Sequence, residues 1–126
     1  MFRVLGRALL SSIFLASSSN AIKNAEQMTG PAEALGLPEP VLAVQAHGIA
    51  NLVGGTMLAL GIKPKLASWI LIGNLVPTTL GGHRFWEEDD EAGKMGQQIH
   101  FVKNLSLLGG LISVIAGERA RSRTAQ

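Results

Sequence analysis

Side chains that could bind an anion or move a proton gather in one stretch of the chain, residues 83–104. The stretch begins with His83 and Trp86 and ends with His100, Lys103 and Asn104. Imidazole can hold or release a proton near neutral pH, and a lysine ammonium can pair with an anion. These residue types therefore indicate a polar site for a small anion, a carbonyl compound or a proton relay.

The two histidines in this stretch leave three interpretations open. His83 and His100 could bind a metal with the nearby acids, hold a quinone carbonyl or relay a proton, or form hydrogen bonds between helices. No two histidines in the chain have the close i, i+4 spacing that helical metal ligands favour, so we expect no metal site. No nucleotide-binding glycine pattern, Walker lysine motif or nucleophile triad is present, so no catalytic residue is assigned.

Five consecutive acids lie between the two ends of this stretch. They are Glu87, Glu88, Asp89, Asp90 and Glu91. A run of like charges is usually a solvated loop, and here it could also dock a protein partner. The net charge of the whole chain is only +2, which is too small to suggest nucleic-acid binding.

Four apolar segments must position these side chains, and we expect them to be transmembrane helices. They cover residues 4–22, 41–62, 66–81 and 99–116, with charges mostly confined to the strips between them. About 20 residues suffice to cross a hydrocarbon core of about 30 Å. The sequence therefore predicts an all-α, four-helix membrane domain over residues 1–116, surrounded by lipid in the cell membrane. A basic tail over residues 117–126 follows, which we expect to be disordered.

The first segment also has the features of a secretory signal peptide. Arg3 and Arg7 precede an apolar run, and Ser19-Asn20-Ala21 would suit a cleavage site. Three further apolar segments follow, so we expect the chain to stay in the membrane whether or not the first segment is cleaved.

The basic residues predict the orientation in the membrane. Most of them lie at the N-terminus, in the turn after the second segment and in the tail: Arg3, Arg7, Lys63, Lys65, Arg119, Arg121 and Arg123. By the positive-inside rule, both termini and that turn are cytoplasmic. The loops at residues 23–40 and 83–98 then face outward, and we expect one helical turn at residues 32–35.

This topology places most polar side chains of the segments in the outer half of the bundle, where Pro77 also lies: Asn20, His47, Asn51, Asn74, Thr78, His83, His100, Lys103 and Asn104. Unpaired polar groups cost several kcal/mol in hydrocarbon, so we expect these side chains to face one another. The candidate ligand pocket consists of His47, Asn51, His83, Trp86, His100, Lys103 and Asn104. Two of these residues could instead have purely structural roles. Lys103 could extend to the outer membrane surface, and Trp86 could anchor the helix at the membrane–water interface.

Adjacent glycines indicate where helices approach each other. Gly54-Gly55 and Gly109-Gly110 lie inside the second and fourth segments. In lipid, small residues allow neighbouring helices to pack closely. We therefore expect both pairs to be packing positions.

Several of these motifs together resemble the DoxX family of small integral membrane proteins. The resemblance covers nearly the whole chain up to about Ala116. Its motifs are Arg3-Val4-Leu5-Gly6-Arg7, Gly54-Gly55, His83-x-x-Trp86, Ile99-His100-Phe101-x-Lys103-Asn104-Leu105 and Leu108-Gly109-Gly110-Leu111. The motif that contains His100 is the most specific of them.

The resemblance implies a four-helix membrane bundle linked to quinone-dependent redox or oxidative-stress complexes. Our first hypothesis is an accessory subunit whose outer pocket contacts a quinone or a small sulfur anion. Lys103 would pair with the anion, His83 and His100 would form hydrogen bonds or move protons, and Asn51 and Asn104 would orient them. The alternative is a non-enzymatic scaffold, chaperone or cargo-type receptor, which other relatives suggest. A transporter is the weaker third possibility, because four helices would need a homo-oligomer to form inverted repeats. The chain has no cysteine, which argues against direct thiol exchange.

Overall fold

Helices make up nearly the whole chain in a computed structural model that describes all 126 residues. The four long ones are α1 (Phe2–Lys23), α3 (Pro40–Leu60), α4 (Pro64–Gly82) and α5 (Glu91–Thr124). Three short elements connect them: the helix α2 (Gly30–Ala34) and the 3-10 turns η1 (Ala25–Gln27) and η2 (Phe85–Glu87). The predicted all-α class is confirmed, and a long helix lies at each of the four apolar segments.

The helix α5 is longer at both ends than the predicted helix over residues 99–116. At its start the Asp90 carboxylate accepts a hydrogen bond from the Gly93 amide at 3.0 Å, which caps the first turn. Near its end Glu118 pairs with Arg121 at 3.4 Å, and the last arginines suit the negative end of the helix dipole. The predictions of a loop up to residue 98 and of a disordered tail are therefore wrong.

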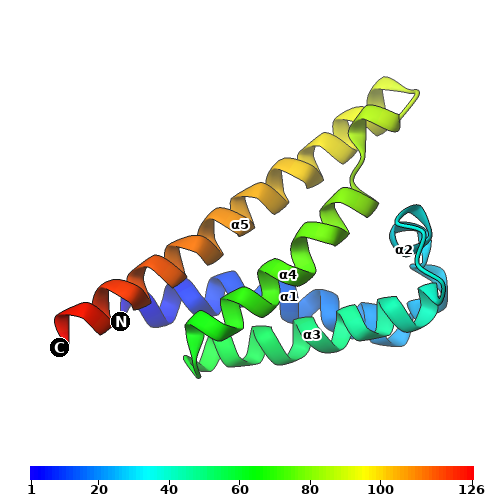
Figure 1. The fold of residues 1–126 in the computed structure, drawn as a ribbon. Helices are drawn as coiled ribbons and strands as arrows, with labels where there is room; N and C mark the ends of the chain where they lie inside the picture. The colour runs from blue at the N-terminus through cyan, green and yellow to red at the C-terminus, as the bar shows by residue number, and fades with distance from the viewer.

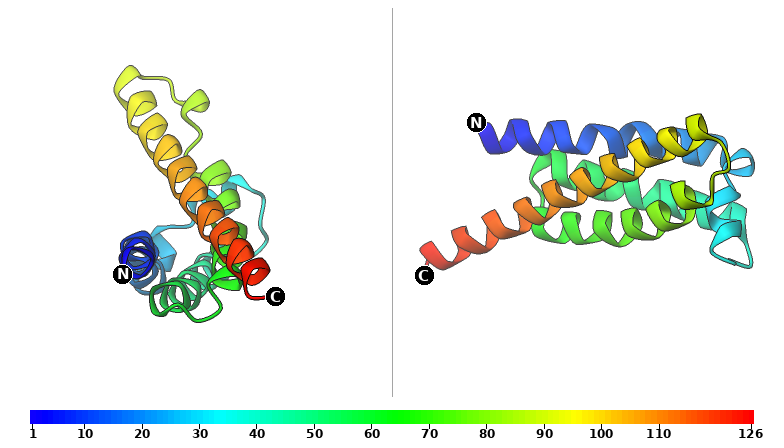
Figure 2. Two further views of the ribbon diagram at one scale, coloured as in Figure 1. Left: turned by 90° about the vertical axis from the view of Figure 1, so that its left-hand side faces the viewer. Right: turned by 90° about the horizontal axis from the view of Figure 1, so that it is seen from above.

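The long helices run alternately in opposite directions. Figure 1 shows α1 and α3 lying side by side, with α4 returning along α3 and α5 leaning across α4. Figure 2 shows that the N-terminal half of α5 diverges from α1 and α3. Both termini and the α3–α4 turn lie at one end of the molecule, which we call the basic end, and α2 lies at the opposite end.

The turn between α3 and α4 is short because two residues adopt left-handed backbone conformations. Gly61 ends α3 with φ 72°, and Lys63 precedes α4 with φ 43°. Pro64 then occupies the first turn of α4, where its missing amide proton costs nothing. This geometry holds α3 and α4 as an antiparallel hairpin.

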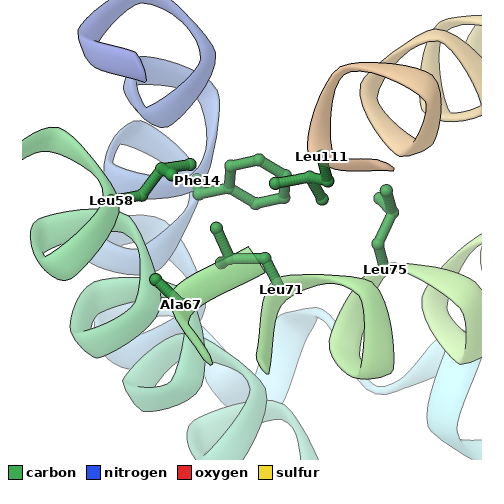
Figure 3. Close-up of a cluster of buried hydrophobic side chains, with 6 residues drawn as sticks. All are labelled: Phe14, Leu58, Ala67, Leu71, Leu75 and Leu111. Atoms are coloured by element: carbon green, nitrogen blue, oxygen red, sulfur yellow. The ribbon is translucent and has the colours of Figure 1, made fainter. Parts of the chain in front are cut away.

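The core is a small apolar cluster where all four long helices meet. It consists of Phe14, Leu58, Ala67, Leu71, Leu75 and Leu111 (Figure 3). A methyl group added at Gly54 would lie 2.9 Å from the Leu71 side chain, and one at Gly55 would lie 3.0 Å from Leu15. The predicted packing role of Gly54-Gly55 is thus confirmed. In the second pair only Gly110 faces a neighbour, while Gly109 faces open space.

Most of the apolar surface of the long helices is not covered by protein. Only 20 of the 126 residues are buried, and large apolar side chains are exposed on each long helix. By length and composition, α3 and α5 are apolar enough to cross a membrane. The most apolar stretches of α1 and α4 have a lower mean hydropathy than those of α3 and α5, because polar residues such as serines and asparagines and a proline interrupt their apolar sequences.

Candidate functional site

A network of hydrogen-bonded polar side chains joins α1, α3 and α4 halfway along the bundle. Asn74 on α4 lies at its centre and donates to Asn51 Oδ1 at 2.7 Å and to the His47 carbonyl at 2.9 Å. Asn51 also donates to Ser17 Oγ on α1 at 3.1 Å. His47 and Asn51 are one turn apart on α3, so their side chains reach the same partner, Asn74.

The network determines which nitrogen of His47 carries the proton. Asn51 Nδ2 can only donate, and it lies 3.2 Å from His47 Nε2, so Nε2 accepts. The proton of the neutral ring is then on Nδ1, which lies 3.0 Å from Asn74 Oδ1 and 3.1 Å from Thr78 Oγ1. The Thr78 hydroxyl donates to the Asn74 carbonyl at 2.8 Å. The His47 Nδ1–H group is therefore shared between two acceptors.

A pocket of about 170 Å³ opens beside this network. Its polar groups come from His47, Asn74 and Thr78, and most of the remaining wall is apolar. The apolar wall comprises Met28, Pro31, Ala32, Leu35, Leu37, Ala43, Val44 and Pro77. A mostly apolar concavity with a few convergent polar groups is the usual form of a small-ligand site.

The short helix α2 closes the pocket at the end opposite the termini. A methyl group added at Gly81 would lie 2.7 Å from the Pro31 carbonyl oxygen, so only glycine lets α2 approach α4 this closely. Ala32 of α2 is buried in a second apolar cluster with Ala21, Ala25 and Val44. The one helical turn expected at residues 32–35 is present over Gly30–Ala34, and it covers the pocket.

Asn104, on α5, packs against a different face of α4 from the face that carries this network. It is buried and donates to Thr79 Oγ1 at 2.9 Å, and Thr79 in turn donates to the Leu75 carbonyl at 2.8 Å. Residues 74 and 78 lie on one side of α4, and residues 75 and 79 lie about 100° around the helix. Asn104 thus joins α5 to α4 and is not part of the pocket.

The other predicted residues form a cluster where α4 passes into α5. The His83 and His100 rings are stacked with centroids 5.0 Å apart, and His83 Nδ1 is 2.8 Å from Gln97 Oε1. Trp86 packs edge-on against Phe101 at 5.9 Å and is half exposed. Lys103 is exposed on α5 and has no hydrogen bond or ion pair.

The single predicted pocket is therefore resolved into three places. His47 and Asn51 lie in the network beside the cavity, Asn104 lies between α4 and α5, and His83, Trp86 and His100 lie at the α4–α5 junction. Lys103 belongs to none of these places, because it is exposed on α5 and unpaired. Ser17, Asn74 and Thr78 complete the network but were not among the candidate pocket residues. The signal for Asn74 and Thr78 was their depth and their i, i+4 spacing on the third segment.

Comparison with known families gives one match. The DoxX family profile matches residues 2–84, which extend from the start of α1 to just beyond the end of α4. The matched range includes the network and the pocket but not the motif around His100 on α5. No curated protein and no solved structure matches the chain.

Proposed function

This chain belongs to the DoxX family, and we propose that it is a four-helix membrane subunit that binds a small carbonyl compound of the quinone class for a redox complex. The family membership and the two long apolar helices indicate a membrane protein. The observation that carries the ligand proposal is the shared Nδ1–H group of His47 at the edge of a mostly apolar pocket.

The exposed side chains support a membrane position for all four long helices. Large apolar residues are exposed on each, for example Leu9 on α1 at 65%, Ile49 on α3 at 54%, Leu66 on α4 at 48% and Ile99 on α5 at 62%. In water, this much contiguous apolar surface would promote aggregation, whereas acyl chains can cover it. The four helices would then cross the membrane together, as a multi-pass protein.

The distribution of charge supports cytoplasmic termini. The basic residues of both termini and of the α3–α4 turn lie at one end of the molecule, and the five acids lie towards the other end (Figure 1). Cytoplasmic segments carry the excess of lysine and arginine in membrane proteins. The pocket beneath α2 would then lie in the outer half of the membrane.

The hydrogen bonding around His47 suits a ligand carbonyl. Nδ1–H is divided between Asn74 Oδ1 and Thr78 Oγ1, and Thr78 already donates to the Asn74 carbonyl. A ligand oxygen can therefore replace Thr78 as the second acceptor without leaving a buried donor unpaired. His47 and Asn74 would orient the carbonyl, while a redox centre in a partner protein would exchange electrons with the bound quinone, donating them to the quinone or accepting them from the quinol.

The size of the pocket limits the ligand to a single ring. An apolar cavity of about 150 Å³ can hold benzene, so about 170 Å³ accommodates one six-membered ring with its carbonyl oxygens. The isoprenoid tail of a quinone would have to extend into lipid. A pocket formed mostly by aliphatic side chains suits the uncharged ring better than a sulfur anion.

The test compares two identical substitutions on α3. Ala43 lines the pocket, whereas Ala46, one turn further along α3, is exposed and lies outside the pocket. We expect Ala43→Leu to fill the pocket and weaken binding of a short-chain ubiquinone analogue by more than about tenfold, and Ala46→Leu to leave it unchanged. Binding is measured on purified protein in nanodiscs by equilibrium dialysis. Equal affinities of the two variants would overturn the proposal, as would absence of binding to the unaltered protein.

A second candidate function is a scaffold that docks a partner through the acidic segment. All five acids at residues 87–91 are exposed, and two of them have structural roles: Glu87 pairs with Arg84 at 3.2 Å, and Asp90 caps α5. The other three carboxylates, Glu88, Asp89 and Glu91, have no ion-pair partner. They are therefore free to contact a basic surface.

This candidate is tested by neutralising those three carboxylates and leaving the fold intact. We expect Glu88→Gln, Asp89→Asn and Glu91→Gln together to reduce recovery of a crosslinked partner protein several-fold. The control neutralises three exposed acids at the same end of the molecule with the same change in net charge: Glu26, Glu33 and Glu39. Equal recovery from both triple variants would contradict docking through the acidic segment.

A further inference from the structure

A second cavity lies at the basic end of the molecule, between α1 and α5. Its volume is about 360 Å³, within the range typical of ligand pockets. It lies at the opposite end from the pocket beneath α2, and the two share no lining residue. Its lining residues are Arg3, Gly6, Arg7, Leu10, Gly110, Ser113, Val114, Gly117 and Glu118.

Arg7 contributes a cation that has no partner in the protein. Its Nε atom is shielded from solvent and makes no hydrogen bond, and no carboxylate lies within ion-pair distance of the guanidinium group. A methyl group added at Gly61 would lie 2.7 Å from Arg7 Nη2, so the guanidinium group is inserted against the α3–α4 turn. An Nε–H group that is shielded from solvent and has no acceptor is unfavourable, and Arg7 also lines the cavity, where its guanidinium group is within reach of an anion from outside.

The surroundings of Arg7 favour a phosphate over other acceptors. Arg3 lies one turn earlier on α1 and lines the same cavity, so two guanidinium groups flank it. Arginine pairs with phosphate oxygens through two parallel hydrogen bonds. The one carboxylate in the lining belongs to Glu118, and Arg121 pairs with it at 3.4 Å.

We propose that Arg3 and Arg7 bind a phosphate group in the cavity between α1 and α5, carried by an anionic phospholipid or by a free phosphate ion. The remaining wall consists of three glycines, Leu10, Val114, Ser113 and Glu118, and Leu10 and Val114 give it an apolar surface beside the two cations. An acyl chain suits this apolar surface, so the phospholipid is the source that the geometry favours. The basic residues at the same end attract anionic headgroups in general, and the cavity adds a defined site.

The experiment measures phosphatidylglycerol binding to the detergent-purified full chain by native mass spectrometry, with phosphatidylcholine as the reference lipid. We expect Arg7→Gln to weaken phosphatidylglycerol binding by at least about tenfold, since it removes a charged, bidentate donor. Arg7→Lys keeps the charge and should give an intermediate loss. The control is Arg119→Gln, because Arg119 is an exposed basic residue at the same end but outside the cavity. The affinity of this variant for phosphatidylglycerol should stay within about twofold of that of the unaltered protein.

A second pair of variants tests the cavity with both arginines intact. A side chain added at Gly117 would meet no neighbour within 4 Å, and this residue lines the cavity, so Gly117→Leu should fill it and weaken binding. Gly109 also faces open space on α5 but lies outside the cavity, so Gly109→Leu should have no effect. This pair decides the proposal even if Arg7→Gln fails to fold.

The source of the phosphate is decided by a parallel titration with inorganic phosphate without lipid, followed by thermal unfolding. Stabilisation by inorganic phosphate that requires Arg7, without selective retention of phosphatidylglycerol, would assign the site to the free ion. Selective retention of phosphatidylglycerol that requires Arg7 would assign it to the lipid. If neither ligand depends on Arg7 or on an open cavity at Gly117, the proposal is overturned.

Discussion

Replacing Asn74 by leucine should destabilise the bundle more than any other single polar change on α4. Asn74 makes three hydrogen bonds to α3: it donates to the His47 carbonyl and to Asn51 Oδ1, and it accepts from His47 Nδ1. Leucine is similar in size, so the change removes these bonds with little steric disturbance. The comparison therefore isolates polar contacts between helices.

The expected magnitude follows from the number of bonds lost. Hydrogen bonds between membrane helices contribute about 0.6 kcal/mol on average, so three amount to about 2 kcal/mol. The Asn51 oxygen also loses its donor, which adds up to about 1 kcal/mol if it finds no other. We expect Asn74→Leu to lower the free energy of unfolding by about 2–3 kcal/mol.

The assay is reversible unfolding in mixed micelles with increasing sodium dodecyl sulfate, followed by far-ultraviolet circular dichroism. The control is Asn20→Leu, because Asn20 is exposed on α1 and bonds only to Asn24, one turn away. The Asn51→Leu variant and the double variant complete a cycle with Asn74→Leu. Because Asn51 and Asn74 share a bond, the double loss should be smaller than the sum of the single losses. An unchanged stability of Asn74→Leu, or strict additivity in the cycle, would refute the network.

Two further changes test the packing and capping described above. Gly54→Ala should cost about 1–3 kcal/mol, because its methyl group would lie 2.9 Å from Leu71, whereas Gly73→Ala meets no neighbour and should be neutral or slightly stabilising in the same unfolding assay. Asp90→Ala removes the side chain that accepts from the Gly93 amide, so it should cost about 1 kcal/mol locally. It should also speed amide hydrogen exchange in the first turn of α5 without changing exchange in α3; unchanged exchange in that turn would rule out the cap.

The positions of the long helices could be predicted because apolar runs of sufficient length have few alternative conformations. The ends of α5 could not be predicted in the same way. The run of five acids suggested a loop, yet Asp90 caps a helix that continues through Gly93 and Gly96. At the other end, low hydrophobicity suggested disorder, but the helix continues to Thr124, about two more turns, and the ion pair between Glu118 and Arg121 supports this extension.

The candidate site was predicted in part because depth in a segment can be calculated from the sequence, whereas rotation around the helix axis cannot. His47, Asn51 and Asn104 all fall in the outer half of their segments, and all three form hydrogen bonds between helices. Only His47 lines the pocket; Asn51 lies behind it in the network, and Asn104 meets α4 on the side of Thr79. The sequence also could not predict that α2 covers the pocket, since this depends on how closely Gly81 lets Pro31 approach α4.

The length of α5 has a mechanical consequence. Its 34 residues form a rod about 50 Å long, while the hydrocarbon core is about 30 Å thick. If α5 crosses the membrane, its ends extend well past the acyl chains, and a continuous helix holds the acids at its start and the arginines at its finish at a constant separation. A force or a bound protein at the acidic end would then tilt the whole rod and displace the arginine end by a comparable distance. Such a helix would rotate as one rigid body across the bilayer, about the point where Leu111 packs into the core.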